Sequence, residues 1–213
     1  MPKFVECEQR SPEWFAVRCG RITASHMDEL FAYGKAKGKE GQELKARADY
    51  RMQILSERLT GQMANHFVTN EMKWGMEQEE YAVSAYEVAR NAMVEAVGFA
   101  IHPTLDFAGA SPDGLVGHDS LIEIKCLTTG RHLEIWKSRQ VPQEYYDQIQ
   151  WNLVCCERFN ADFVCFDSRL PQHLQLFIIP VVYDEKRVSE LEAEVCKMND
   201  EVCALMAEYG IKA

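Results

Sequence analysis

The stretch that decides the fold is residues 111–126, which read SPDGLVGHDSLIEIKC. Residues 117–120, near its centre, have the composition of a tight turn. The residues after that turn alternate in the manner of a β-strand. Because side chains point to opposite faces along a strand, Glu123 and Lys125 share one face and the apolar residues around them share the other. The stretch therefore predicts a hairpin that displays an acid and a base side by side.

Two carboxylates meet if the chain folds back at this turn. Asp113 comes just before the turn, so a hairpin brings its carboxylate beside Glu123. These two side chains and the backbone carbonyl of Ile124 can hold a hard cation such as Mg²⁺, which prefers a few carboxylates, retains waters and accepts phosphate oxygens. The cation lowers the pKa of a bound water, and the ammonium of Lys125 positions that water and offsets charge in the transition state. The alternative is an ordinary polar hairpin whose charged side chains are solvated.

The hairpin residues resemble the PD-(D/E)xK nuclease motif, and more narrowly the phage lambda exonuclease family of YqaJ-type viral recombinases. Three further stretches match that family in the same order along the chain, at residues 14–25, 74–79 and 147–151. The resemblance covers residues 11–183, which is most of the chain. It implies an α/β fold with a restriction-endonuclease-like core, in which a central mixed β-sheet is flanked by helices.

The order of the elements predicted along the chain agrees with this fold class. A helix is expected to begin at Thr23, and others are expected at residues 14–19, 44–59, 75–86 and 142–157. A polar turn is expected at residues 127–131, and strand-like segments at 96–110, 121–126, 161–166 and 174–183. Helices and strands in this order form a mixed sheet flanked by helices. The 213 residues contain no repeat and no linker, so we expect a single domain, residues 1–213.

Residues 184–213 predict a C-terminal amphipathic helix. Apolar side chains recur there at alternating spacings of three and four residues: Val188, Leu191, Val195, Met198, Val202, Leu205 and Tyr209. Such a stripe packs onto its own domain in most proteins and forms a subunit or partner interface in the others. The sequence leaves both possibilities open.

A second candidate site lies near the N-terminus. Ser11 and Pro12 have the residue types of a helix start, and Arg18 lies near the end of that helix. If Thr23 caps the next helix, Ser25 stands in its first turn, where unpaired N–H groups attract an anion, and Arg18 adds donors suited to phosphate. The alternative is a capped surface helix with a solvated arginine. The resemblance implies that Arg18 and Ser25 bind the 5′-terminal phosphate of DNA.

The resemblance also assigns roles to residues that spacing alone leaves anonymous. It implies that Glu79 is a metal-site acid, with Glu80 as the alternative if the helix is phased differently. It places Gln148 at the active site and makes Met72 an apolar wedge at the end of the duplex. Without the resemblance, the acids describe a charged helix face, Gln148 is an ordinary helix residue, and a lone methionine is more often core filler.

The distribution of charge bears on DNA binding more than its total does. The chain carries a net charge of −10, whereas a DNA-binding protein is expected to have a basic footprint. Residues 184–208 have a local balance of −5, and residues 34–47 have one of +3. Lys35 belongs to the basic segment, in a glycine-rich loop where lysines can contact the phosphodiester backbone. A solvated loop is the equally plausible alternative.

Composition narrows the cellular setting. The best apolar run, residues 174–183, is too short to span a bilayer, and the N-terminus lacks the apolar region of a signal peptide. We therefore expect a protein of the bacterial or phage-infected host cytoplasm with no membrane partner. The eight cysteines form no CxxC and no zinc-finger spacing, which suggests reduced core thiols.

Taken with the resemblance, these patterns predict a Mg²⁺-dependent 5′→3′ exonuclease on double-stranded DNA ends, with Mn²⁺ able to replace Mg²⁺. The resemblance implies a ring-shaped homotrimer that works with a single-strand annealing protein in phage-type homologous recombination. The alternatives are a PD-(D/E)xK endonuclease with the same metal site and a non-catalytic DNA-end-binding protein. An endonuclease has no use for an end-reading pocket, and a complete metal motif speaks against a non-catalytic protein.

Overall fold

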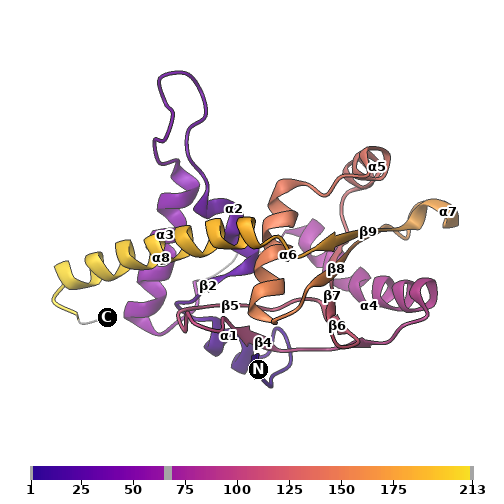
Figure 1. Ribbon diagram of the computed structural model, residues 1–213, viewed down its shortest axis with the longest axis horizontal. Helices are drawn as coiled ribbons and strands as arrows, with labels where there is room; N and C mark the ends of the chain where they lie inside the picture. The colour runs from indigo at the N-terminus through magenta and orange to yellow at the C-terminus, as the bar shows by residue number, and fades with distance from the viewer. Residues whose placement is uncertain (1, 65–68, 212–213) are drawn as a thin grey trace.

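The computed structural model describes residues 2–64 and 69–211. The side chains of Glu71 and Met72 also lie outside the described part of the chain. The described residues form one α/β domain in which helices flank two mixed β-sheets (Figure 1). The α/β class with flanking helices is as predicted, but the strands divide between two sheets instead of forming one.

The larger sheet contains the predicted hairpin. Its strands lie in the order β3 (Val94–Glu95), β6 (Gly114–Val116), β7 (Ser120–Lys125), β8 (Asn160–Phe166) and β9 (Leu176–Val182). β7 is the middle strand, and it pairs antiparallel with β6 and parallel with β8. Gly117, in the turn between β6 and β7, has a φ of 56°, in the left-handed region that favours glycine.

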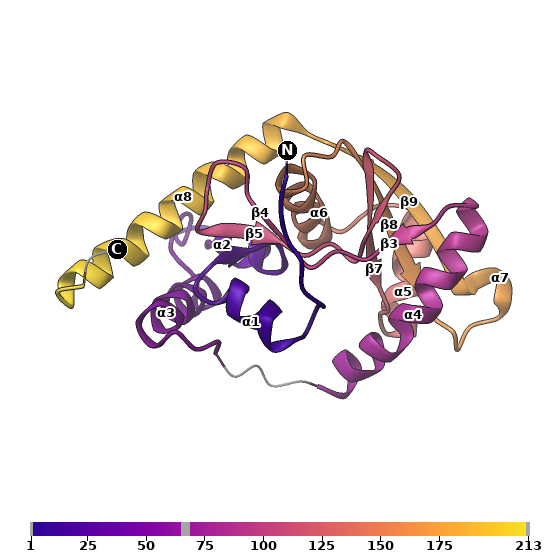
Figure 2. The same cartoon turned by 90° about the horizontal axis from the view of Figure 1, so that it is seen from below.

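The side chains of β7 face two different layers, as their alternation predicted. Ile122 and Ile124 pack with α4 (Asn70–Arg90) in a small cluster of their own. Leu121, on the other face, belongs to the main core beside α6 (Gln143–Cys155). The two helices therefore lie on opposite faces of the larger sheet (Figure 2).

The smaller sheet joins the N-terminal part of the chain to the middle. Its strands lie in the order β1 (Lys3–Val5), β4 (Phe99–Ile101), β5 (Ala108–Ala110) and β2 (Ile22–Thr23). β2 is parallel to β5, and the other pairs are antiparallel. The segments near it are α1 (Pro12–Arg18), the 3₁₀ turn η1 (Ala24–His26) and α2 (Met27–Leu30). Ser11 caps α1, because its side chain accepts from the N–H of Trp14.

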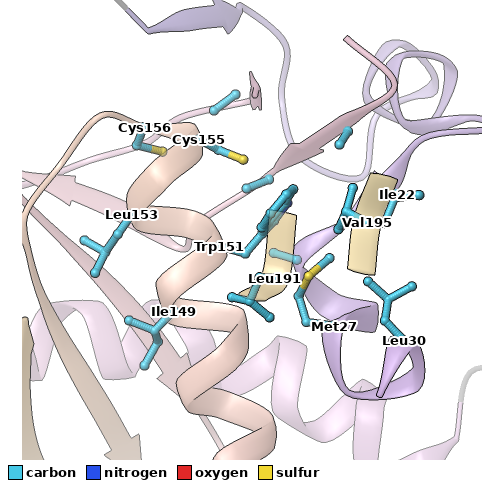
Figure 3. Close-up of a cluster of buried hydrophobic side chains, with 14 of the residues drawn as sticks. Ile22, Met27, Leu30, Ile149, Trp151, Leu153, Cys155, Cys156, Leu191 and Val195 are labelled. Atoms are coloured by element: carbon cyan, nitrogen blue, oxygen red, sulfur yellow. The ribbon is translucent and has the colours of Figure 1, made fainter. Parts of the chain in front are cut away.

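The main core fills the space between α2, α6 and α8 (Glu185–Glu208) (Figure 3). Trp151 of α6 is its largest side chain and has no exposed surface. Met27 and Leu191 reach the same cluster from the other two helices. This packing fixes α6 between the two sheets, and α6 carries part of the candidate site.

The C-terminal helix packs onto its own domain. The stripe residues from Val188 to Val202 are buried, whereas Tyr209 is exposed and Met206 is buried in its place. α8 crosses α3 (Lys45–Thr60) and packs against it (Figure 1). The apolar stripe is therefore used mainly inside the domain.

A buried arginine joins α3 to α8. Arg47 is 1% exposed and forms ion pairs with Glu43, Glu194 and Glu201 at 2.7–3.1 Å. These bonds neutralise part of the acidic charge of α8. Arg47 was counted in the basic segment 34–47, but the structure shows that its side chain is buried and paired with acids of the same chain.

Three segments differ from the predicted elements. α4 begins at Asn70 and not at Gly75, because one glycine costs about 1 kcal/mol of helix propensity and does not end a helix that packs on a sheet. The polar turn expected at residues 127–131 opens a helix, α5 (Thr129–Ser138), which buries His132 and Ile135. Thr23 does not cap an α-helix, because it ends β2 and precedes η1.

Three further observations complete the fold. The short helix α7 (Gln172–Gln175) precedes β9. All eight cysteines are free thiols, and Cys155, Cys156 and Cys165 are buried, in agreement with the expectation of core thiols. In residues 2–64 and 69–211, no helix has the length and apolar character needed to cross a membrane.

Candidate active site

Glu123 is the most deeply buried charged group of the hairpin, with 1% of its surface exposed. A buried carboxylate is costly unless it is hydrogen-bonded and paired. Its Oε1 accepts from Nζ of Lys125 at 2.7 Å and from Nε2 of Gln148 at 2.6 Å, and its Oε2 accepts from Nδ2 of Asn152 at 2.7 Å. Gln148 and Asn152 lie one turn apart on α6, so this helix presents two amides to one carboxylate.

Asp113 lies at the start of the other arm of the hairpin. It directly precedes β6, and its Oδ2 accepts the backbone N–H of Ile124 at 2.6 Å. Burial raises the pKa of Asp113 well above its ordinary value, and the nearby charge of Glu123 raises that pKa further. The carboxyl of Asp113 is therefore harder to ionise here than in water, even though the nearby charge of Lys125 acts in the opposite direction on its pKa.

Lys125 connects the two arms of the site electrostatically. Its Nζ donates to Oε1 of Gln148 at 3.1 Å as well as to Glu123. The same ammonium lies 5.1 Å from the ring centre of Tyr145, within the range of a cation–π contact. Burial opposes the charge of Lys125, but Glu123 and Asp113 outweigh this and raise its pKa above the ordinary value. The amine is therefore held as an ammonium.

Glu79 reaches the site from α4. Its Oε2 accepts from Nη2 of Arg10 at 2.5 Å. Arg10, Glu79, Glu80 and Asp113 all line an open pocket of about 810 Å³. The negative charge of Glu79 contributes to the raised pKa of Asp113, so the two acids interact electrostatically. Both acids considered from the sequence thus border the pocket.

The donor set suits a hard divalent cation with few protein ligands. Asp113 and Glu123 provide carboxylate oxygens, and Glu79 shares a pocket with Asp113. In the part of the chain that the structure describes, no three His, Cys, Asp or Glu side chains are grouped as a metal cluster. Mg²⁺ is commonly bound by one or two carboxylates and several waters, so two acids are sufficient for it. Ile124 enters the site through its N–H, and its carbonyl as a ligand stays a prediction.

Arg18 is a partly buried cation whose hydrogen-bond partners among the described residues are hydroxyl groups. Its Nη2 lies 3.3 Å from Oγ of Ser25 and 3.3 Å from Oγ1 of Thr23. Its guanidinium carbon lies 4.1 Å from the ring centre of Trp14. Burial lowers the pKa of Arg18 to about 10, and its buried Nε has no hydrogen-bond partner in the described structure. A guanidinium in this state is suited to an anionic ligand.

The Arg18 group adjoins the carboxylate site through a short chain of contacts. Nε1 of Trp14 donates to Oγ of Ser111 at 2.8 Å, and Ser111 lies two residues before Asp113. The structure thus brings Arg18 and Ser25 together, although Ser25 stands in a 3₁₀ turn and not in the first turn of an α-helix. The two candidate sites are neighbours.

The two remaining predicted DNA contacts have different outcomes. Lys35 is exposed in the loop between α2 and α3, which projects from the domain (Figure 1). Lys35 is not among the residues that line the pocket at Asp113. Met72 falls in α4, but its side chain lies outside the described residues.

The sequence interpretation missed three residues of the site. Asn152 follows Gln148 by four positions, so helical spacing could have found it once Gln148 was placed. Tyr145 precedes Gln148 by three positions and could have been found in the same way. Arg10 lies 69 residues from Glu79 in sequence, and no local pattern connects them.

Comparison with known proteins agrees with this architecture. The model of the YqaJ-like viral recombinase domain matches residues 13–158. The crystal structure of an alkaline exonuclease, LHK-Exo, from Laribacter hongkongensis is similar with a TM-score of 0.85 and 35% identity, over 94% of this chain and 96% of that chain. LHK-Exo in complex with dAMP gives a TM-score of 0.83 and 33% identity, over 94% and 98% of the two chains.

A more distant structure shares the fold alone. A phage-related exonuclease from Haemophilus somnus 129PT has a TM-score of 0.67 and 17% identity, over 89% of this chain and 96% of that chain. No curated protein matches the chain.

Asn152 provides a direct test of how the carboxylate site is held. Asn152→Ala removes the donor to Oε2 of Glu123 and leaves that oxygen free to turn away. We expect the affinity for Mn²⁺, measured by titration calorimetry, to fall by about tenfold or more, as when other supporting partners of metal ligands are removed. Gln150→Ala is the matched control, because Gln150 is equally buried on α6 but bonds to Val182 and Asp184. Equal Mn²⁺ affinity in wild type and Asn152→Ala would contradict this role.

Proposed function

The chain belongs to the family of YqaJ-like viral recombinase domains, and on that basis we propose that it is a Mg²⁺-dependent 5′→3′ exonuclease acting on the ends of double-stranded DNA. Nuclease activity is supported by the family and by the similarity to an alkaline exonuclease. The observation that carries the finer proposal is the partly buried Arg18, whose Nε has no hydrogen-bond partner in the described structure, beside the carboxylate site. Carboxylates alone suit any phosphodiesterase, whereas an adjoining anion pocket suits an enzyme that holds a strand end.

The carboxylate site would hold the cation. Asp113 and Glu123 would be its side-chain ligands, with the carbonyl of Ile124 and the carboxylate of Glu79 completing the protein contribution. When bound, Mg²⁺, or Mn²⁺ in its place, would supply an acidified water and stabilise charge on the scissile phosphate. The raised pKa of Asp113 supports this assignment, because a cation is the charge that this pair of acids lacks.

Lys125 and Gln148 would act on the water and the phosphate. Their polar atoms are 3.1 Å apart and both contact Oε1 of Glu123, so the three groups form one hydrogen-bonded unit. The ammonium would hold the attacking water and offset the negative charge that develops on the phosphate. The amide of Gln148, which both donates and accepts, would orient the same water or a phosphate oxygen.

The 5′ polarity is proposed from the Arg18 pocket. Arg18 and Ser25 would bind the 5′-terminal phosphate, which places that end of the strand at the carboxylates. Hydrolysis of the adjoining phosphodiester would release a 5′-mononucleotide and leave a new 5′-phosphate for the next cycle. DNA contacts by Lys35 and Met72 belong to the same proposal.

In the described part of the chain, no feature of the site specifically favours either alternative, an endonuclease or a non-catalytic DNA-end-binding protein. An endonuclease would use the carboxylates in the same way, but it has no strand end to place in the pocket of Arg18. Efficient nicking of closed circular DNA would favour it. A non-catalytic end-binding protein would not need an ammonium beside two carboxylates, and cation-dependent release of nucleotides would rule it out.

The assembly and its setting are also proposals. We propose that the chain forms a homotrimer, that a single-strand annealing protein uses its product in phage-type recombination, and that it acts in the cytoplasm. A closed ring would hide its subunit interfaces and enclose DNA.

Sedimentation velocity tests the trimer. At micromolar concentration we expect a species of about three times the 24.5 kDa chain mass. A species of one chain mass under these conditions would contradict the proposal. DNA digestion by that single chain would show that the ring is not needed for hydrolysis.

The chemistry is tested by substitution at the carboxylates and at the lysine. Asp113→Ala should abolish release of nucleotides from linear duplex in Mg²⁺ while leaving DNA binding in EDTA intact, because it removes a cation ligand and little core volume. Lys125→Ala should lower turnover by about a hundredfold or more, the effect of losing a preorganised charge from a transition state. Lys137→Ala, an exposed change on α5, is the control. Normal digestion by Asp113→Ala would place the cation elsewhere.

The strand end is tested by combining a change in the protein with one in the DNA. Duplex with a 5′-phosphate should be digested faster than duplex with a 5′-hydroxyl, and Arg18→Ala should remove most of that preference. Loss of one charge-assisted hydrogen bond corresponds to roughly a tenfold to a hundredfold lower rate on the phosphorylated substrate. Arg21→Ala is the matched control, since Arg21 donates to the backbone carbonyls of Val17 and Asp106. An unchanged preference in Arg18→Ala would make Arg18 a structural residue.

A further inference from the structure

A second pocket adjoins the carboxylate site, and the proposed chemistry makes no use of it. It has a volume of about 220 Å³, and its lining residues are Asn70, Trp74, Cys126, Leu127, Thr128 and Arg169. Its two large side chains form a stacked pair, with the guanidinium carbon of Arg169 3.9 Å from the ring centre of Trp74. Apolar and aromatic surface beside a planar cation is unusual for a site that only retains water.

Arg169 is held in this position by several bonds. Its Nε donates to Oδ1 of Asp167 at 2.7 Å, and its Nη2 donates to Oδ2 of Asp167 at 3.0 Å and to the carbonyl of Leu127 at 3.0 Å. Asp167 has no exposed side-chain surface and also accepts from Thr129 at 2.6 Å. The Arg169 side chain is nevertheless 47% exposed. A fixed guanidinium is thus presented to solvent with one face on Trp74.

The charge of the pair indicates what it would bind. Asp167 forms an ion pair with Arg169 through two hydrogen bonds. The negative charge of Asp167 therefore weakens the attraction of Arg169 for a distant phosphate. What remains available is the planar surface of the guanidinium and the indole. Such surfaces stack on nucleobases, and every base has a face that can stack. The pocket is therefore better suited to a base than to a phosphate.

The position of the pocket relates it to the cleavage site. Cys126 lines the pocket and directly follows Lys125, so the two sites share the carboxyl end of β7. Trp74 lies on α4 five residues before Glu79, which corresponds to about 7.5 Å along a helix axis. A strand whose phosphodiester lies at Asp113 would therefore have a neighbouring base within reach of Trp74.

We propose that Trp74 and Arg169 form a nucleobase-stacking subsite for the DNA strand whose phosphodiester is cleaved. The subsite takes one base next to the scissile bond, without reading its identity, and holds it out of the duplex. This inference rests on the proposed nuclease function. The stacking subsite would position the DNA strand through one of its bases, whereas the Arg18 pocket would position the strand through its terminal phosphate.

The test is binding of DNA that lacks one base. A duplex with a 5′-phosphate is prepared with a single abasic nucleotide at each of the first few positions of that strand. Binding is measured in EDTA, where no hydrolysis occurs, by fluorescence anisotropy. For the wild type, one abasic position should weaken binding by about tenfold, within the range measured for the stacking of one base on an aromatic side chain. Trp74→Leu and Arg169→Gln should weaken binding of intact DNA by a similar factor and be insensitive to that abasic position.

The control is a second stacked pair on the same domain. Arg139 lies 4.8 Å from the ring centre of Trp136 at the end of α5, outside both pockets. Arg139→Gln should bind like the wild type and keep the abasic effect. Arg169→Lys keeps the charge but loses the planar face, so it should resemble Arg169→Gln. Thermal melting identifies any variant that is unfolded, and the proposal is judged on the folded variants among Trp74→Leu, Arg169→Gln and Arg169→Lys.

The outcomes separate this inference from the proposed function. If no abasic position weakens binding by the wild type, or if Arg169→Gln keeps the full abasic effect, the subsite does not exist. Nucleotide release from the same intact duplex in Mg²⁺ is measured in parallel with wild type and Asp113→Ala. Release that depends on Asp113 without an abasic effect would leave the nuclease proposal standing and overturn only the subsite. An abasic effect without release would support stacking and overturn the nuclease proposal.

Discussion

The candidate site depends on the cost of keeping the carboxylate of Glu123 away from water. Removing an ionised carboxylate from solvent costs several kcal/mol unless its oxygens are paired. Lys125 and two amides of α6 supply that pairing, so β7 and α6 have to meet in one register. The same requirement fixes the ammonium beside the carboxylate. The bonds that satisfy the buried carboxylate are thus the same bonds that hold Lys125 in place for its proposed role in hydrolysis.

The second face of β7 supplies the other half of the site. Ile122 and Ile124 pack against α4, and that packing sets where the helix lies over the sheet. Glu79 then borders the same pocket as Asp113, while Trp74 lies over the end of β7. One helix therefore positions an acid at the proposed cation site and an aromatic surface beside that site. In the structure Arg10 donates a hydrogen bond to the carboxylate of Glu79, so this acid is paired with a cationic side chain of the same domain.

The charge distribution reconciles a net charge of −10 with the proposed DNA substrate. Much of the acid is on α8, where Arg47 and Arg51 bind Glu201, and Arg47 also binds Glu194, in the packing of the domain. Arg18, in contrast, is partly buried, and its hydrogen-bond partners among the described residues are hydroxyl groups. The positive charge is thus left where an anion would bind, whereas acidic charge elsewhere is neutralised internally or solvated. The field at a site depends on this local arrangement and not on the sum over the chain.

The sequence alone determined the features that depend on neighbours along the chain. Alternation in residues 121–126 assigned the two faces of β7, and the residue types of Ser11 and Pro12 marked the start of α1, because pleat and cap geometry are local. Motif resemblance identified the family because its matching stretches kept their order. Local patterns gave the wrong element boundary where tertiary packing determined it. Gly75 lies inside α4, and residues 129–131 form the first turn of α5.

Only the tertiary structure decided which distant groups share an environment. It paired Arg47 with the acids of α8, Arg10 with Glu79, and Arg169 with Trp74. In each case the partners are separated by dozens of residues, and no spacing rule connects them. The physical reason is that burial, charge pairing and stacking depend on distance in space, which is set by how the two sheets and their covering helices pack together.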